Sequence, residues 1–260
     1  MKKIYTIILS FFSLLVVSQN EQLAQNYFDK GEFDKAASLY EEMEKKQPNN
    51  FYFTQKLVAC FQGLKQFSKA EKVLLSKKET NNQPIIFVEL GYNAQLEKDQ
   101  KKADLYYKKA LDVVAKQPNY AYQIGQAYEQ KSLLLQAYST YEIAQKTNSS
   151  MNFDYQMALL QGQMGNLDVM VVKLLDYSYA NINSTVSVQN QLVFFMQDDA
   201  ENVFANSLKK ELLLRTQKTQ DIYWNQFLSW LYINLKEYNK AFIQEKSIYK
   251  RNPESFDDII

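Results

Sequence analysis

The 260-residue chain contains no histidine and only one cysteine, Cys60. Without histidine it lacks the usual general base, the usual proton switch near neutral pH and the commonest metal ligand. One cysteine rules out an intramolecular disulfide, and its place in the apolar stretch 57–61 predicts a buried thiol. The sequence also lacks a glycine-rich phosphate loop and a serine in a nucleophile elbow. It therefore predicts a protein that is not an enzyme and that holds no cofactor or metal.

Glycine and proline are scarce, with six and four residues, which favours helices joined by short turns. Apolar residues make up 46% of the chain, enough to bury a substantial interior. The formal net charge is +1, and removing Lys2 and Lys3 gives +1 − 2 = −1. So balanced a charge is not expected to attract nucleic acid. Glu41 and Glu42 sit beside lysines, which predicts a solvated helix face rather than acid–base chemistry.

The N-terminal residues have the pattern of a secretory leader. Two lysines precede an apolar run over residues 4–17, and the small residue Ser18 stands before Gln19. We expect residues 1–18 to be a cleaved signal peptide and the mature chain to have no membrane span; a retained anchor is the alternative. The leader resembles those of Bacteroidetes-type Gram-negative bacteria, which implies an exported protein, periplasmic or associated with the outer membrane.

Alanine and proline recur along the chain with one period. The alanines are Ala36, Ala70, Ala103 and Ala137, separated by 34, 33 and 34 residues. The prolines Pro48, Pro84 and Pro118 follow at intervals of 36 and 34 residues. A repeat of this length built from helical pairs is typical of a solenoid, in which each repeat packs on its neighbours.

The first repeat also carries a more specific pattern of small and aromatic residues. The positions concerned are Ala24, Tyr27, Gly31, Phe33, Ala36, Tyr40 and Pro48. With these spacings the chain resembles the tetratricopeptide repeat family, in which small residues let two helices approach closely. The resemblance implies an all-α fold, a right-handed superhelical solenoid of antiparallel helix pairs.

The same frame divides the rest of the chain. We expect five repeats over residues 19–177, one degenerate helical repeat over 178–221 and a further repeat over 222–253. Residues 254–260 look like the start of another helix, which favours a chain that is a fragment of a longer protein.

The degenerate repeat has its own expected helices. The first is expected over residues 184–196 and the second over 200–217. Asp198 and Asp199 lie between them, and acids before a helix are favourable near its N-terminal dipole. We therefore expect helix capping there rather than metal binding.

The family resemblance implies that the first helix of each repeat lines a concave groove. Carried over by phase, the lining residues are Phe28, Tyr52, Gln55, Tyr92, Gln95, Tyr122, Gln126, Glu129, Tyr155, Gln163, Tyr223, Gln226 and Trp230. This set is rich in tyrosine and glutamine and nearly devoid of cations, so we expect it to bind a protein or peptide partner. Aromatic residues at helical spacing also suit a core, which is the competing interpretation.

The function indicated is a non-catalytic protein-binding scaffold of the bacterial cell envelope. One alternative is the N-terminal sensor or docking region of a longer signalling protein. Another is a glycan-associated accessory protein, because aromatic grooves also stack on sugars. End-to-end self-association is a further possibility that periodicity does not decide.

Overall fold

The computed structural model describes residues 19–81, 83–197, 199–219 and 221–253, and every regular element among them is helical. The expected leader over residues 1–18 and the expected helix start over 254–260 lie outside this part of the chain. The all-α fold of antiparallel helix pairs is confirmed within the described residues.

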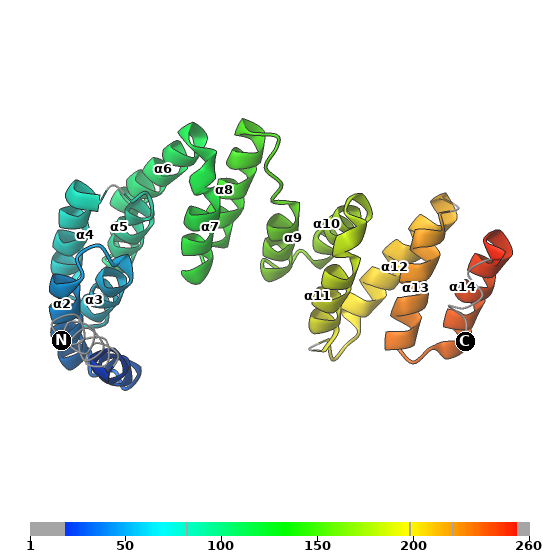
Figure 1. The fold of residues 1–260 in the computed structure, drawn as a ribbon, viewed down its shortest axis with the longest axis horizontal. Coiled ribbons are helices and arrows are strands. Elements are labelled where there is room, and N and C mark those ends of the chain that lie inside the picture. The colour runs from blue at the N-terminus through cyan, green and yellow to red at the C-terminus, as the bar shows by residue number, and fades with distance from the viewer. Residues whose placement is uncertain (1–18, 82, 198, 220, 254–260) are drawn as a thin grey trace, which may run out of the picture. The chain divides into compact units, whose positions relative to one another are not determined.

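The helices fall into two compact units, and the boundary between them along the chain lies between Asn148 and Ser149 (Figure 1). Unit 1 contains a helix over residues 19–29, α2 (Phe33–Lys46), α3 (Phe51–Gly63), α4 (Phe67–Asn81), α5 (Ile85–Leu96), α6 (Gln100–Lys116), the 3-10 turn η1 (Pro118–Tyr120), α7 (Ala121–Gln130) and α8 (Leu134–Thr147). Unit 2 contains α9 (Asp154–Gln163), α10 (Leu167–Ala180), the 3-10 turn η2 (Ile182–Ser184), α11 (Thr185–Gln197), α12 (Val203–Lys218), α13 (Ile222–Asn234) and α14 (Tyr238–Arg251).

Six helix pairs share one three-residue turn with a left-handed middle residue. Those residues are Gly31, Lys65, Lys98, Ser132, Gly165 and Lys236, with φ between 55° and 85°. In each turn the amide of the third residue donates to a carbonyl five residues earlier, as from Gln66 N to Phe61 O at 2.8 Å. This bond satisfies a carbonyl that the helix end leaves free and reverses the chain sharply.

The sequence marks only two of these turns with glycine. Gly31 and Gly165 adopt positive φ readily, whereas lysine or serine stands at the same place in the other four. The turn geometry is therefore retained where the glycine signal is missing.

Within unit 1, glycine on a first helix lets a second-helix tyrosine pack against the backbone. A Cβ placed on Gly91 would lie 2.3 Å from the Tyr107 ring, and one on Gly125 would lie 2.4 Å from the Tyr141 ring. Both tyrosines are buried. Their hydroxyls donate to first-helix side chains, and burial raises the pKa of each phenol. The α5–α6 and α7–α8 pairs are thus each held by a close contact and a directed hydrogen bond.

The repeat that the sequence marks as degenerate differs at its turn. Its helices α11 and α12 are joined by five residues, and α12 begins three residues later than expected. The Asp199 carboxylate accepts a hydrogen bond from the Ala205 amide at 2.9 Å, so Asp199 caps α12 as expected. Asp198 lies outside the described residues.

The single cysteine lies in the core of the first two repeats. Cys60 has no exposed surface and packs with Ala24, Tyr40 and Leu57. Burial raises the pKa of its thiol to about 12, so the thiolate is scarce near neutral pH. The expectation of a buried thiol is confirmed.

The Tyr141–Gly125 contact predicts the cost of adding one methyl group. Gly125→Ala places a Cβ against a ring that has no exposed surface and no room to move. We expect a net loss of stability on the order of 1–2 kcal/mol, because overpacking outweighs the helix propensity that alanine gains. Urea unfolding measures it, with the neighbouring exposed Gln126→Ala as the control. Equal stability of the Gly125→Ala protein would contradict the close contact.

Candidate partner-binding surfaces

The first helices of unit 1 are joined by a line of polar contacts. Lys56 Nζ donates to Gln25 Oε1 at 2.8 Å, which links α3 to the helix over residues 19–29. Gln55 Nε2 donates to Glu89 Oε1 at 3.0 Å, which links α3 to α5. The other carboxylate oxygen of Glu89 pairs with Lys131 Nζ at 2.8 Å, at the end of α7. We call Gln25, Gln55, Lys56, Glu89 and Lys131 the polar ribbon.

The ribbon corrects one expectation, that the lining is nearly devoid of cations. Lys131 Nζ lies 4.6 Å from the centre of the Tyr92 ring. Lys56 Nζ lies 5.2 Å from the Phe28 ring centre and 5.5 Å from that of Tyr52. Phase alone did not indicate these lysines, because their long side chains reach aromatic residues on neighbouring turns and helices.

Two predicted contact residues hold the fold. Gln95 Oε1 accepts a hydrogen bond from the Tyr107 hydroxyl at 2.9 Å, and Glu129 Oε1 accepts one from the Tyr141 hydroxyl at 2.7 Å. Their polar ends are therefore oriented by the repeat itself. A partner would meet side chains that are already fixed in place.

Other predicted residues of unit 1 are open to solvent. The Tyr122 side chain is 52% exposed, and its hydroxyl accepts a hydrogen bond from Gln126 Nε2 at 2.9 Å. Tyr52 is 40% exposed and borders a depression of about 450 Å³ together with Glu21 and Asp29. These tyrosines offer contact area with few rotatable bonds to immobilise.

In unit 2 the predicted residues meet around α11. The Tyr155 hydroxyl lies 3.5 Å from Gln191 Oε1, and the Tyr223 hydroxyl lies 3.2 Å from Thr185 Oγ1. Gln191 and Thr185 belong to the degenerate repeat, which the sequence interpretation did not include in the lining.

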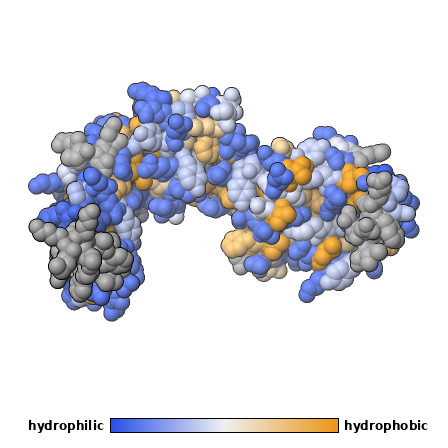
Figure 2. Space-filling view, in the orientation of Figure 1, coloured by the Kyte–Doolittle hydropathy of each residue, from blue (hydrophilic) through white to orange (hydrophobic). Residues whose placement is uncertain are grey.

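The remaining predicted residues of unit 2 divide into core and surface. The Trp230 ring is half-buried and packs edge-on against Phe227 at 5.3 Å between ring centres. Gln163 and Gln226 are exposed. Unit 2 also exposes apolar side chains such as Val186 and Phe194, and Figure 2 shows several apolar areas on the face of this unit turned to the viewer.

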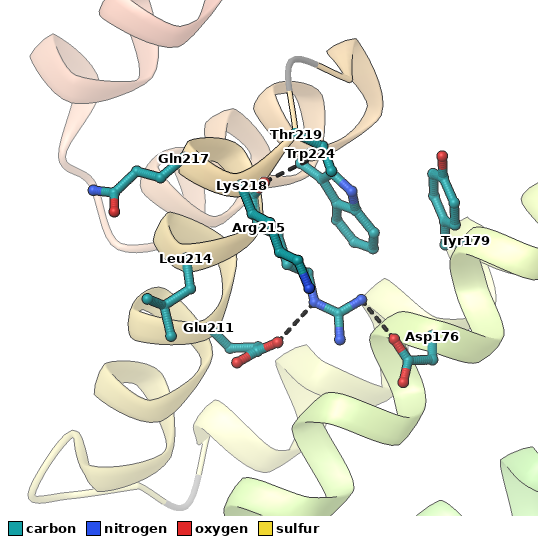
Figure 3. Close-up of a pocket in the computed structure, with 9 residues that line it drawn as sticks. All are labelled: Asp176, Tyr179, Glu211, Leu214, Arg215, Gln217, Lys218, Thr219 and Trp224. Atoms are coloured by element: carbon teal, nitrogen blue, oxygen red, sulfur yellow. Dashed lines mark hydrogen bonds and ion pairs between the residues drawn. The ribbon is translucent and has the colours of Figure 1, made fainter.

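Unit 2 also contains a cleft that the sequence interpretation missed. It has a volume of about 750 Å³ and lies where α10, α12 and the start of α13 meet (Figure 3). We call it the α10–α12 cleft. Arg215 lies at its centre, and its guanidinium pairs with Asp176 at 2.7 Å and with Glu211 at 2.8 Å. The same guanidinium lies 4.6 Å from the Trp224 ring.

Residue rarity was the signal that could have found this cleft. The chain has two tryptophans and two arginines, and one of each meets in it. The repeat pattern is weak in residues 178–221, so the repeat frame did not mark Arg215 as a candidate site residue.

The described residues hold no group of three or more cysteine, aspartate or glutamate side chains placed to bind a metal ion. Of the helices in the same part of the chain, none has the length and apolar character needed to cross a bilayer.

Comparison with known proteins gives distant relatives. No family model matches the chain. It is 23% identical over 240 residues to the BBSome complex member BBS4 of Bos taurus, covering 90% of this chain and 44% of that protein. The mouse protein of the same name is 32% identical over 92 residues, 35% of this chain and 18% of that protein. The chain thus spans less than half the length of these curated relatives.

Solved structures with tetratricopeptide repeats match this chain with low TM-scores. The TPR2AB domain of yeast Sti1 with a pHSP90 peptide is 14% identical, covers 94% of this chain and 95% of that chain, and has a TM-score of 0.34. A tetratricopeptide repeat protein of Parabacteroides merdae is 15% identical, covers 94% and 96%, and has a TM-score of 0.33. The tetratricopeptide-like fold of this chain is evident from its own helix pairs, turns and small-residue contacts.

The buried ion pair of the polar ribbon predicts a large effect from one substitution. The Glu89 and Lys131 side chains are 4% and 16% exposed. Lys131→Met leaves the carboxylate without its cation, so we expect a loss of about 3–5 kcal/mol in unfolding free energy, measured by urea denaturation.

The matched control is an exposed pair. Lys146→Met removes the partner of Glu142, where both side chains are largely exposed, and is expected to cost less than about 0.5 kcal/mol. Adding Glu89→Gln to Lys131→Met is expected to restore part of the loss. Equal, small losses in both single variants would show that the Glu89–Lys131 pair does not stabilise unit 1.

Proposed function

We propose that the chain is a non-catalytic scaffold that binds a protein or peptide partner along the first helices of unit 1. The observation that carries the proposal is the exposed Tyr122–Gln126 pair on α7, the helix whose C-terminal end the hydrogen-bonded polar ribbon reaches through Lys131. Tyrosine supplies broad contact area, and glutamine can hydrogen-bond an extended backbone. Side chains that are ordered before binding lose less conformational entropy when the partner arrives.

The relatives support a role within an assembly. The cattle and mouse proteins are named as members of a protein complex. A scaffold that holds partners by surface complementarity fits such a role, and repeat folds provide extended surfaces for it.

We further propose that the protein works in the bacterial cell envelope, after export directed by residues 1–18. The support is the cationic start and apolar run of that segment.

The export proposal predicts the mass of the protein isolated from its own cells. The mature chain is expected to begin at Gln19 and to be found in the envelope fraction. Intact-mass spectrometry measures this, with the full-length chain made without a membrane system as the reference. A protein that keeps residues 1–18 and stays in the cytoplasmic fraction would overturn the proposal.

The scaffold proposal predicts that one surface governs partner capture. The tagged chain is used to capture proteins from an extract of the cells that produce it, and captured proteins are quantified by mass spectrometry. Tyr122→Ala combined with Gln126→Ala is expected to reduce a stoichiometric partner about tenfold or more, because few interface residues carry most of the binding energy.

Leu135→Ala provides the control for this capture. Leu135 is 70% exposed on α8, the second helix of the same pair, and its replacement is expected to leave capture unchanged. A partner lost with Leu135→Ala but retained by the α7 variant would place binding on the second helices and contradict the proposal.

A further inference from the structure

The α10–α12 cleft contains a stack of side chains that is open at one end. Trp224 lies between Arg215 and Tyr179 (Figure 3). The guanidinium carbon is 4.6 Å from the Trp224 ring, and the Tyr179 ring stacks on the same indole with 5.0 Å between centres and 23° between planes. Trp224 is buried, whereas Tyr179 is 46% exposed. The open end of the stack is therefore the tyrosine ring.

Tyr179 is held firmly for an exposed residue. Its hydroxyl donates to Asp221 Oδ2 at 2.6 Å, and the Tyr223 ring packs against it edge-on at 5.4 Å. Asp221 is itself fixed, because its other oxygen caps α13 by accepting from the Tyr223 amide at 2.9 Å. A phenol that donates to a carboxylate gains electron density in its ring, which favours a cation over the ring face. The same bond raises the pKa of Tyr179.

The charges that line the cleft, together with Asp221, favour a cationic occupant. Three carboxylates, Asp176, Glu211 and Asp221, face two cations, Arg215 and Lys218, so the local net charge is 2 − 3 = −1. Arg215 already pairs with two of the carboxylates, yet the Asp176 side chain remains 63% exposed. Asp176 and Tyr179 are three residues apart on α10 and so share one face of that helix. Lys218 is exposed on a flexible side chain that can move away.

We propose that the α10–α12 cleft binds an arginine side chain from an extended segment of a protein partner, with its guanidinium stacked on the open face of Tyr179, beside the Asp221 carboxylate that holds the phenol. Arg215 already makes the equivalent contact on the neighbouring indole while it pairs with Asp176. Arginine suits the site better than lysine, because a planar guanidinium stacks on a ring while forking to a carboxylate. The proposal relies on the chain being a protein-binding scaffold but concerns a different surface from the α7 pair.

The test follows the two tryptophan indole N–H signals of the full chain by NMR, assigned with Trp230→Phe. The probe is a nine-residue glycine–serine peptide with two arginines; matched peptides carry lysine or the uncharged isostere citrulline. We expect the arginine peptide to shift the Trp224 signal, lysine to bind more weakly and citrulline not to bind. Tyr179→Leu is expected to weaken arginine-peptide binding about fivefold to tenfold, and Asp176→Asn, which only makes the net charge of the cleft less negative, to weaken it less.

The controls separate this proposal from the proposed function. Tyr122→Leu, at an exposed tyrosine of unit 1, is expected to leave the Trp224 response unchanged. Tyr179→Phe keeps the ring and is expected to lose less binding than Tyr179→Leu. The phenylalanine variant also provides a test if the leucine variant misfolds. The arginine proposal would be overturned if the Trp224 signal did not move or if the citrulline peptide bound equally well. It would also be overturned if the Trp224 signal responded to lactose alone, which would indicate a glycan site. None of these results depends on capture through α7.

Discussion

The α5–α6 and α7–α8 pairs of unit 1 depend on a buried second-helix tyrosine packed against a first-helix glycine. At Gly91 and Gly125 there is no room for a Cβ, so the tyrosine ring lies directly on the helix backbone. The ring brings its hydroxyl across the helix to a polar side chain, Gln95 in one repeat and Glu129 in the next. Close packing and a directed hydrogen bond thus come from the same residue, which fixes the spacing within each pair.

This contact links the stability of the repeat to its surface. Because the buried tyrosines donate hydrogen bonds to Gln95 and Glu129, these two lining side chains are held in one orientation. The Glu89–Lys131 pair adds a second constraint, since it joins one first helix to the end of the next. The exposed side chains that remain, such as Tyr122, therefore stand on a rigid surface, and this suits recognition of an extended partner.

The first helix pair of unit 2, α9 and α10, lacks the tyrosine–glycine contact, and unit 2 contains a cleft. Leu174 and Ala158 take the places of the tyrosine and glycine, so no hydroxyl reaches across the pair. The hydroxyls of Tyr155 and Tyr223 instead reach side chains of α11, and five residues rather than three connect α11 to α12. Between α10 and α12 the stack of Arg215 and Trp224 fills part of the space and leaves a cleft. The segment with the weakest repeat pattern thus contributes α12 to a cleft of about 750 Å³.

The sequence by itself determined the all-α fold, the helix pairs and the buried thiol, because these depend on periodic small and apolar residues that recur near every 34 positions. It also located the cap at Asp199, which depends on local chain chemistry. Only the tertiary structure decided which lining residues bond within the fold, as Gln95 does, and which are exposed to solvent, as Tyr122 is. It alone placed Lys131 over Tyr92 and brought Arg215 to Trp224 and Asp176. Such contacts join side chains that are far apart in sequence. Because these side chains are long and flexible, their contacts produce no periodic pattern in the sequence from which they could be predicted.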